Sequence, residues 1–170
     1  MKALNIDFLQ KLPLFDGLSE DKLQKVKEIT SLRTFTAGSY IIRENEKGGE
    51  LFILLDGEVE VSRTLMLKIA GRGLDQKDKL LNKITGQDHA FFGEMSLFDD
   101  NCERSASVIA TKDCTVAVLE RDSFFKLSES DVAIGYIILK NILKIVSERL
   151  DKTTKDVLKL TTALSLALER

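Results

Sequence analysis

The chain has 170 residues, 44% hydrophobic and 31% charged, which is the balance of a folded globular protein of about one domain. Its 25 basic and 27 acidic residues leave a net charge of −2, so the total charge favours neither nucleic acid nor an acidic membrane as a partner. No apolar run approaches the roughly 20 residues that a membrane span needs, and residues 1–10 lack a secretory apolar core, so we expect a cytoplasmic protein.

The first thirty residues predict short helices. A turn-rich segment over 12–17 is followed by Ser19 and acidic residues, the usual beginning of a helix with a side-chain N-cap. Because Leu23, Val26 and Ile29 recur at helical spacing, we predict a short amphipathic helix over 19–30.

The middle of the chain predicts antiparallel β structure. Short runs of apolar and β-branched residues alternate with turn residues, a spacing typical of rolls and barrels. Strands are expected over 32–36, 40–43, 50–55, 58–63, 80–85, 107–110 and 115–119. The fold class predicted is mainly β with flanking helices, an antiparallel β-roll (jelly-roll or double-stranded β-helix) of about eight strands.

Two connections in this region have distinct turn chemistry. Asp56-Gly57 stands between two strand-like runs, and this pair favours a tight two-residue hairpin turn. The stretch 71–79 is polar, contains Gly71 and Gly73 and shows little periodicity. We therefore expect an exposed loop or the end of a long hairpin there.

After Arg121 the pattern changes to helix. A short helix is expected over 122–127, and a long one over about 131–168, which no proline interrupts. We therefore divide the chain into a β-roll with its N-terminal helices, residues 1–130, and a long C-terminal helix, residues 131–170.

The long helix contains a regular heptad seam. Its members lie alternately four and three residues apart: Leu139, Leu143, Val146, Leu150, Thr153, Val157, Leu160, Leu164 and Ala167. One alternative is that this stripe packs on the roll of its own chain, but a helix of ~57 Å is longer than a small domain. We therefore favour a parallel two-stranded coiled coil across a homodimer, through residues 131–168, with the polar Thr153 as its weak point.

Residues suited to metal or redox chemistry are scarce. The single histidine, His89, argues against the His-rich metal sites of β-roll enzymes such as isomerases and dioxygenases. We therefore expect no metal, no cofactor and no enzymatic activity. Cys102 and Cys114 have no Cys/His cluster around them, and we expect two reduced thiols.

The segment 91–108 has the residues of a small-anion site. Gly93 permits close backbone approach, and a turn or short helix beginning near Glu94 would point free N–H groups at an anion. Arg104 offers a charged fork for phosphate oxygens, and the Glu94 carboxylate suits a pair of sugar hydroxyls. These features together describe a sugar phosphate. The alternative is that Glu94 and Arg104 form an ordinary ion pair on a loop.

This segment contains two notable runs, Phe91-Phe92-Gly93-Glu94-Met95-Ser96-Leu97-Phe98 and Glu103-Arg104-Ser105-Ala106-Ser107-Val108. Together they resemble the phosphate-binding cassette of cyclic-nucleotide-binding domains. The Glu-Arg-Ser-Ala run most resembles the regulatory domain of the bacterial catabolite activator (cAMP receptor) proteins. Kinase regulatory domains usually have a proline before that arginine, which this chain lacks. The resemblance extends from residue 12 to about 160, through 14–18, 37–43 and 51–59.

The resemblance implies roles for individual residues of the cassette. Glu94 would hold the ribose 2′-hydroxyl, and Arg104 and Ser105 the cyclic phosphate, with help from backbone amides near Gly93. The predicted ligand-binding residues as a set are Gly93, Glu94, Met95, Arg104, Ser105, Ala106, Thr153 and Thr154, supported by Arg149.

The resemblance also includes the long helix. In the activator branch an arginine is followed four residues later by a Thr-Ser pair that meets the adenine, and here Arg149 is followed by Thr153-Thr154. By that likeness Arg149 pairs with Glu94, and the two threonines touch the base from the two chains of the dimer. The alternative is that both threonines are ordinary helix residues.

Departures from the family pattern are few. Asn45 stands where a tight turn usually has glycine, a change that the left-handed tolerance of asparagine accommodates. The approach to Gly93 over 86–92 and the loop around Gly71 are longer than usual, which predicts different ligand access.

The expected function is a cyclic-nucleotide receptor, with cAMP favoured, that couples binding to the arrangement of a dimeric helix. The family's transcription factors continue into a helix-turn-helix domain, for which this chain has no room, so we expect no direct nucleic-acid contact. The signal would pass to an unknown effector protein or a missing output domain. Because a hydroxyl after the cassette arginine also serves guanine in related domains, cGMP stays an alternative, as does a degenerate roll that only dimerises.

Overall fold

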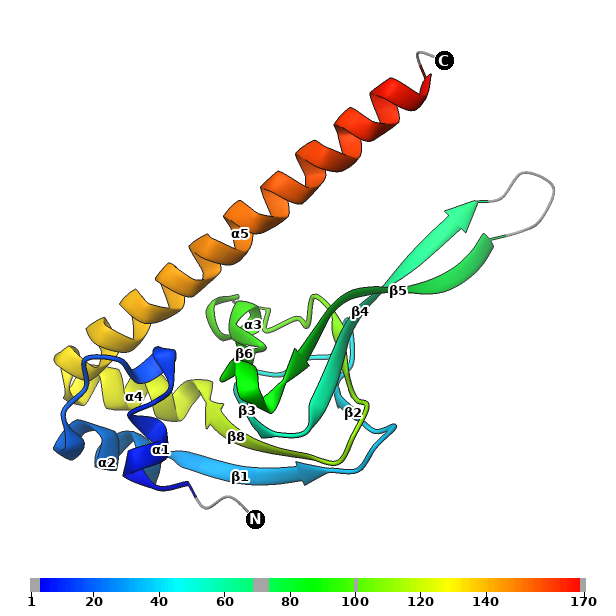
Figure 1. Cartoon of the computed structure of the whole chain (residues 1–170). Helices are drawn as coiled ribbons and strands as arrows, with labels where there is room; N and C mark the ends of the chain where they lie inside the picture. Colours follow the sequence, from blue (N-terminus) through cyan, green and yellow to red (C-terminus); the bar gives the residue numbers. More distant parts are fainter. Residues whose placement is uncertain (1–3, 69–73, 100, 169–170) are drawn as a thin grey trace.

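The computed structural model of the chain describes residues 4–68, 74–99 and 101–168, which form a β-roll with flanking helices and one long projecting helix (Figure 1). The helical elements are α1 (Ile6–Leu9), η1 (Pro13–Phe15), α2 (Glu20–Glu28), η2 (Gly86–Asp88), α3 (Glu94–Phe98), α4 (Arg121–Ser130) and α5 (Val132–Leu168). The strands are β1 (Thr30–Phe35), β2 (Tyr40–Ile42), β3 (Glu50–Asp56), β4 (Glu58–Lys68), β5 (Leu74–Thr85), β6 (Phe91–Phe92), β7 (Ser107–Ala110) and β8 (Cys114–Glu120).

These strands form two antiparallel sheets of four. One sheet has the order β1-β8-β3-β6, and the other has the order β2-β7-β4-β5. The predicted fold class, an antiparallel roll of about eight strands with flanking helices and a long C-terminal helix, is therefore confirmed. Among the described residues, no helix has both the length and the apolar character that crossing a membrane requires.

Strand β3 separates two hydrophobic cores, which explains its unbroken apolar run. Phe52 and Leu54 pack between the two sheets. Leu51, Ile53 and Leu55 face the opposite way, into a cluster formed with the helices. Because successive side chains on a strand point to opposite faces, burial of both faces requires five apolar residues in a row.

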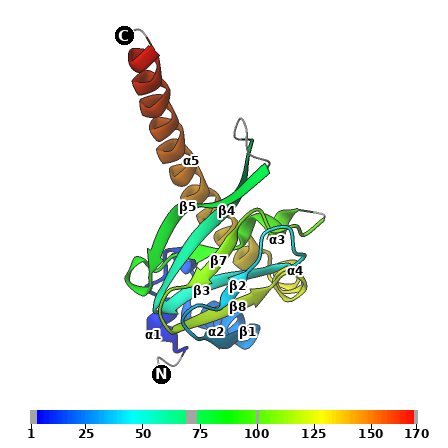
Figure 2. The same cartoon turned by 90° about the vertical axis from the view of Figure 1, so that its right-hand side faces the viewer.

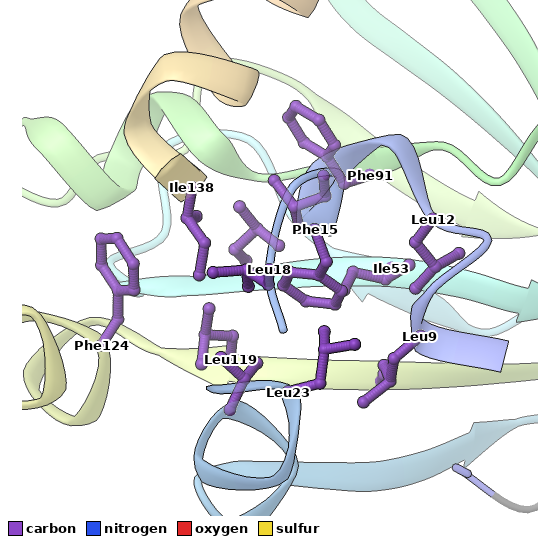
Figure 3. Packing of buried hydrophobic residues seen from close by; sticks show 14 of the residues in the cluster. Leu9, Leu12, Phe15, Leu18, Leu23, Ile53, Phe91, Leu119, Phe124 and Ile138 are labelled. Carbon is purple, nitrogen blue, oxygen red and sulfur yellow. The ribbon is translucent and has the colours of Figure 1, made fainter. Parts of the chain in front are cut away.

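The second core joins the helices to the outer face of the sheet that contains β3. Figure 3 shows Phe15 and Leu23 from the N-terminal helices packed with Phe124 of α4 and Ile138 of α5. Ile134, Ile138 and Ile142 are all buried, and their four-residue spacing places them on one face of α5. The first three turns of α5 are thereby part of the domain core.

Polar contacts fix the same end of α5 to the N-terminal segment. The buried Asn141 donates from Nδ2 to the carbonyl oxygens of Leu14 (3.0 Å) and Asp16 (2.9 Å). Just before α5, the Asp131 carboxylate binds Lys22 (2.7 Å) and Lys25 (2.9 Å) of α2, and these hydrogen bonds, that from Lys22 foremost, hold the pKa of Asp131 below its usual range.

The distal part of α5 leaves the roll. All residues of this helix from Leu150 to its end are exposed, including the seam residues Val157, Leu160 and Leu164. The helix has 37 residues and a length of ~56 Å. The alternative in which the whole stripe packs on its own roll is wrong. Of the seam residues only Val146 packs against the core, whereas Leu139 and Leu143 are exposed like the distal members.

The hairpin expected at Asp56-Gly57 is wrong. Strands β3 and β4 lie in different sheets, and the two residues carry the chain from one sheet to the other. Gly57 has a φ of +95°, and a Cβ there would lie 2.4 Å from the carbonyl oxygen of Asp113. The Asp-Gly pair thus identified the turn conformation, but turn chemistry does not specify which strands pair.

For the stretch 71–79, the expected end of a long hairpin is confirmed and the exposed loop is wrong for 74–79, because β5 begins at Leu74 and pairs with β4. Residues 71–73 lie outside the described part of the chain. The polar stretch 74–79 pairs with β4 in a two-stranded hairpin that extends past the roll on the same side as α5 (Figure 1, Figure 2). Strand β6 is too short for a periodic signal. Ser19 is at the N-cap position of α2, but its side chain makes no capping hydrogen bond.

Replacing Asn141 with alanine should lower the free energy of unfolding by about 2 kcal/mol, because two carbonyl oxygens near the core lose their donor. Urea denaturation followed by circular dichroism measures the change. The control is Lys140→Ala, at an exposed position next to it in α5, which should shift stability by less than ~0.5 kcal/mol. Equal stability of the two variants would contradict the role given to Asn141.

Candidate functional site

A cavity of about 420 Å³ lies between the roll, the segment 93–106 and the middle of α5. Seven of the eight predicted ligand-binding residues line it, together with the predicted supporting arginine: Gly93, Glu94, Met95, Arg104, Ser105, Ala106 and Thr153, with Arg149. Thr154 is exposed and does not line this cavity. Gly93 and Thr153, which are 60 positions apart in the sequence, thus line the same cavity.

Gly93 begins the segment with a conformation that requires glycine. Its φ of +82° is left-handed, and it is the N-cap of α3, the short helix that was expected to begin near Glu94. A Cβ at Gly93 would lie 2.8 Å from the carbonyl oxygen of Glu50 and 2.9 Å from Nη1 of Arg104. The absence of a side chain therefore lets the Arg104 guanidinium reach β3.

Arg104 lies beside the cavity but is almost wholly buried, with 5% of its surface exposed. Its Nη2 binds the Glu50 carboxylate at 2.6 Å, and its Nη1 donates to the backbone oxygen of Glu50 (2.8 Å) and to Oγ of Ser96 (2.6 Å). The carbonyl oxygen of Gly93 is a longer third acceptor at 3.3 Å. Protein acceptors thus fix the guanidinium in place.

The charge of Arg104 is balanced by Glu50. Burial lowers the pKa of the Arg104 guanidinium, and the Glu50 carboxylate opposes this effect. Arginine nevertheless stays protonated in proteins, so a positive charge stands at the cavity wall.

Glu94 pairs with α5 rather than with Arg104. The Arg149 guanidinium donates from Nη1 to Oε1 of Glu94 at 3.1 Å and from Nη2 to the carbonyl oxygen of Phe91 at 2.7 Å. It also lies 4.7 Å above the centre of the Phe91 ring. The alternative of a Glu94–Arg104 ion pair is wrong, whereas the Arg149–Glu94 pair that the resemblance implied is present. This pair is a direct polar link between the cassette and the long helix.

The two threonines on α5 follow Arg149 by one turn. Their hydroxyls donate to backbone oxygens of their own helix, Thr153 to Arg149 and Thr154 to Leu150, both at 2.9 Å. Only Thr153 faces the cavity of its own chain.

The second half of the cassette is joined to the loop between β2 and β3. The N–H of Arg104 donates to the carbonyl oxygen of Glu46 (3.0 Å), and the N–H of Asn45 donates to that of Arg104 (2.9 Å). Asn45 has a φ of +66°, so asparagine does take the left-handed conformation expected at this turn. The loop thereby fixes the backbone of the residue that supplies the charge.

Several residues of the cavity wall were not predicted from the sequence. Arg63 lies on β4, Leu81 and Asn82 lie on β5, and Ser96 lies on α3. The register of β4 and β5 shifts between Asn82 and Leu80, which leaves Leu81 as an extra residue in a β-bulge. A bulge of this kind has no distinct sequence signal. Glu50, likewise, was identified only as the beginning of a strand.

Both cysteines are free thiols in the structure. Cys114 is buried between the sheets, and burial raises the pKa of its thiol. Within residues 4–68, 74–99 and 101–168, no group of three His, Cys, Asp or Glu side chains is placed to hold a metal ion.

The family model for the cyclic nucleotide-binding domain matches residues 32–131, which contain the cassette and all of the two sheets except the first two residues of β1. The chain belongs to this family. The family expected from the cassette is therefore confirmed, and the chain is a cyclic nucleotide-binding regulatory domain.

Related proteins carry this domain within longer chains. Human cGMP-dependent protein kinase 2 is 34% identical over 119 residues, which are 69% of this chain and 14% of the kinase. The cAMP-dependent protein kinase regulatory subunit of Mycosarcoma maydis is 33% identical over 109 residues, 64% of this chain and 18% of that subunit. The chain thus spans less than a fifth of the length of either curated relative.

Among solved structures, the catabolite activator protein of Thermus thermophilus superposes with a TM-score of 0.70. The two sequences are 25% identical, and the match covers 88% of this chain and 63% of that protein. The two proteins therefore share the fold over most of this chain.

The close approach at Gly93 can be separated from its backbone strain by a matched pair of substitutions. Gly38 has a similar φ of +85°, but nothing lies within 4 Å of the position of its Cβ. Both Gly38→Ala and Gly93→Ala incur the left-handed strain, and only Gly93→Ala also displaces Arg104 and β3. We expect Gly93→Ala to lower the free energy of unfolding by about 1 to 3 kcal/mol more than Gly38→Ala in urea titrations. Equal losses would show that Gly93 is needed for its φ alone.

Proposed function

We propose that the chain is a cyclic-nucleotide receptor, with cAMP as the favoured ligand, which reports binding through a dimeric α5. The observation that carries the proposal is the cavity itself, whose wall joins the cassette to α5 through the Glu94–Arg149 ion pair. A ligand in this position contacts the roll and the helix together. No catalytic residue, metal or cofactor takes part in this function.

The chemistry of the cavity wall suits a cyclic sugar phosphate. The buried positive charge of Arg104 and the hydroxyl of Ser105 would hold the cyclic phosphate, and the Glu94 carboxylate would accept the ribose 2′-hydroxyl. Because Nη1 and Nη2 of Arg104 already have protein acceptors, the phosphate takes over part of this hydrogen bonding rather than meeting a free guanidinium.

The base would lie against α5. Thr153 faces the cavity and offers a hydroxyl to the adenine edge, and Thr154, which is exposed, would reach the base in the partner chain of a dimer. The alternative ligand is cGMP. It is favoured by the hydroxyl of Ser105 next to the cassette arginine and by the cGMP-dependent kinases among the relatives. Titration with each nucleotide therefore decides between adenine and guanine as the base.

The dimer would form along the exposed seam of α5. Leu150, Val157, Leu160 and Leu164 are each more than half exposed in the single chain, and large apolar side chains in such a row are stabilised by a second helix. A nucleotide that binds one arrangement of roll and helix more tightly than another shifts the equilibrium between them by that difference in affinity. An effector protein or output domain at α5 would receive the signal, with no direct contact to nucleic acid or membrane.

The central test is calorimetric titration of the purified chain with cAMP and, separately, with cGMP. We expect saturable binding of one nucleotide per chain, tighter for cAMP. Arg104→Ala should weaken binding by more than ~2 kcal/mol, about 30-fold, because it removes a charge-assisted phosphate contact. The control is Arg33→Ala, which removes an exposed arginine that is 3.7 Å from the same Glu50 but outside the cavity.

Because Arg104 is buried, its variants are first checked for cooperative thermal unfolding. Ser105→Ala is a milder companion variant that removes only one hydroxyl from the cavity wall. Equal affinities of Arg104→Ala, Ser105→Ala and the unmodified protein would contradict the assignment of the site. Binding of neither nucleotide would favour the degenerate roll that only dimerises.

The seam is tested by a charge in its centre. Leu160→Glu should raise the dimer dissociation constant roughly 100-fold or more, because each dimer loses two buried leucines. The control is Lys159→Glu at the neighbouring exposed position outside the seam, which should leave the constant nearly unchanged. Analytical ultracentrifugation measures both. A monomeric mass for the unmodified chain at micromolar concentration would contradict the dimer.

A further inference from the structure

Met95 combines exposure with a contact to the cassette. It lies on α3 at the edge of the cavity, and 62% of its surface is exposed to solvent. The hydroxyl of Ser105 donates to its Sδ at 3.3 Å. The thioether is a weak hydrogen-bond acceptor, so the Ser105 hydroxyl has only a weak partner in the protein. The contact places the Met95 sulfur beside the hydroxyl that is proposed to hold the phosphate.

Exposure of this side chain is not required by the fold. The next apolar residue of α3, Leu97, is fully buried, whereas Met95 projects from the other side of the helix into solvent. An exposed thioether is open to oxidation, because reactivity of methionine follows its accessibility to peroxides. The site already described therefore contains one atom that solvent oxidants can modify without unfolding the protein.

We propose that Met95 is an oxidation site through which hydroperoxides lower the affinity of the cassette for a cyclic nucleotide. This inference rests on the proposed function. In the reaction the terminal peroxide oxygen is transferred to Sδ, so that an S–O bond forms and the O–O bond breaks. The sulfur loses two electrons and becomes a sulfoxide, and the hydroperoxide is reduced to water or an alcohol. Methionine sulfoxide reductases reverse this change.

The sulfoxide affects the anion site in two ways. Its oxygen is a strong hydrogen-bond acceptor, so the Ser105 hydroxyl donates to this oxygen instead of to the phosphate. It also brings a partial negative charge to the wall where Arg104 offers a positive one. Both effects oppose the binding of an anion and leave the buried network of Arg104 intact.

Other sulfur atoms are separated from this effect by variants. The chain has two more methionines, Met1 and Met66, and two cysteines. Met95→Leu keeps an apolar side chain of similar size at the cavity edge and removes the oxidisable sulfur together with the weak acceptor of Ser105. Met66→Leu is the matched control, since it leaves Met95 in place.

The experiment treats the purified chain with hydrogen peroxide until peptide mass analysis shows a gain of one oxygen on Met95, and then titrates it with cAMP and cGMP. We expect binding to weaken by about threefold to tenfold, the factor for one neutral hydrogen bond. Met66→Leu should behave in the same way. The affinity of Met95→Leu, compared with that of the same variant before treatment, should not change, and sulfoxide reduction of the oxidised unmodified chain should restore binding.

Each outcome has one meaning. Unchanged affinity after complete oxidation of Met95, or an equal loss in Met95→Leu, contradicts the inference while the proposed function stands. Absence of nucleotide binding by the untreated chain contradicts the proposed function and removes the site on which the inference rests. In Ser105→Ala the oxidation effect should shrink, because the hydroxyl that the sulfoxide holds is missing.

Discussion

A single buried charge organises the site. Removing a guanidinium from water costs several kcal/mol unless its hydrogen bonds are replaced, and Arg104 replaces them with Glu50, Ser96 and a backbone oxygen. This arrangement also requires glycine at two positions, because a Cβ at Gly93 or at Gly48 would lie within 3 Å of a guanidinium nitrogen. The acceptors and the two glycines around Arg104 therefore serve together to hold one positive charge at the wall of the cavity.

The long helix α5 has two parts with different surroundings. Its proximal turns contribute Ile134, Ile138 and Ile142 to the core, and Asn141 binds them to the N-terminal segment. Its distal turns are exposed along their whole circumference. Arg149 stands between the two parts and binds Glu94, so the cassette and the projecting helix meet through one ion pair. A ligand that competes for Glu94 acts on this junction.

Much of the fold could be predicted because hydrophobic periodicity and turn residues indicate where most helices, strands and turns lie. The helical spacing of Leu23 and Val26 and the proline-free run from residue 131 identified α2 and α5 closely. Asp56-Gly57 identified a turn, but the sheet to which each flanking strand belongs depends on contacts distant in sequence. Polar residues of β5 formed a strand because pairing with β4 outweighed their weak propensity.

The residues of the candidate site and the Glu94–Arg149 pair could be predicted, but the partners of Arg104 could not. The resemblance to the cassette identified Gly93, Glu94 and Arg104, and the resemblance of the long helix to that of the activator branch implied Arg149. No local sequence pattern indicated that Glu50 would form an ion pair with Arg104, because the two residues are 54 positions apart and come together only in the folded roll. The bulge that brings Leu81 and Asn82 to the cavity could not be predicted either, because it depends on the pairing register of β4 and β5 and not on the types of these residues.

The most direct test of this account is a crystal structure of the chain grown with a saturating concentration of cAMP. The account predicts the cyclic phosphate against Arg104 and Ser105, the ribose 2′-hydroxyl on Glu94 and the base facing Thr153. A nucleotide bound elsewhere, or an unoccupied cavity with the Arg104–Glu50 and Arg149–Glu94 pairs unchanged, would contradict it.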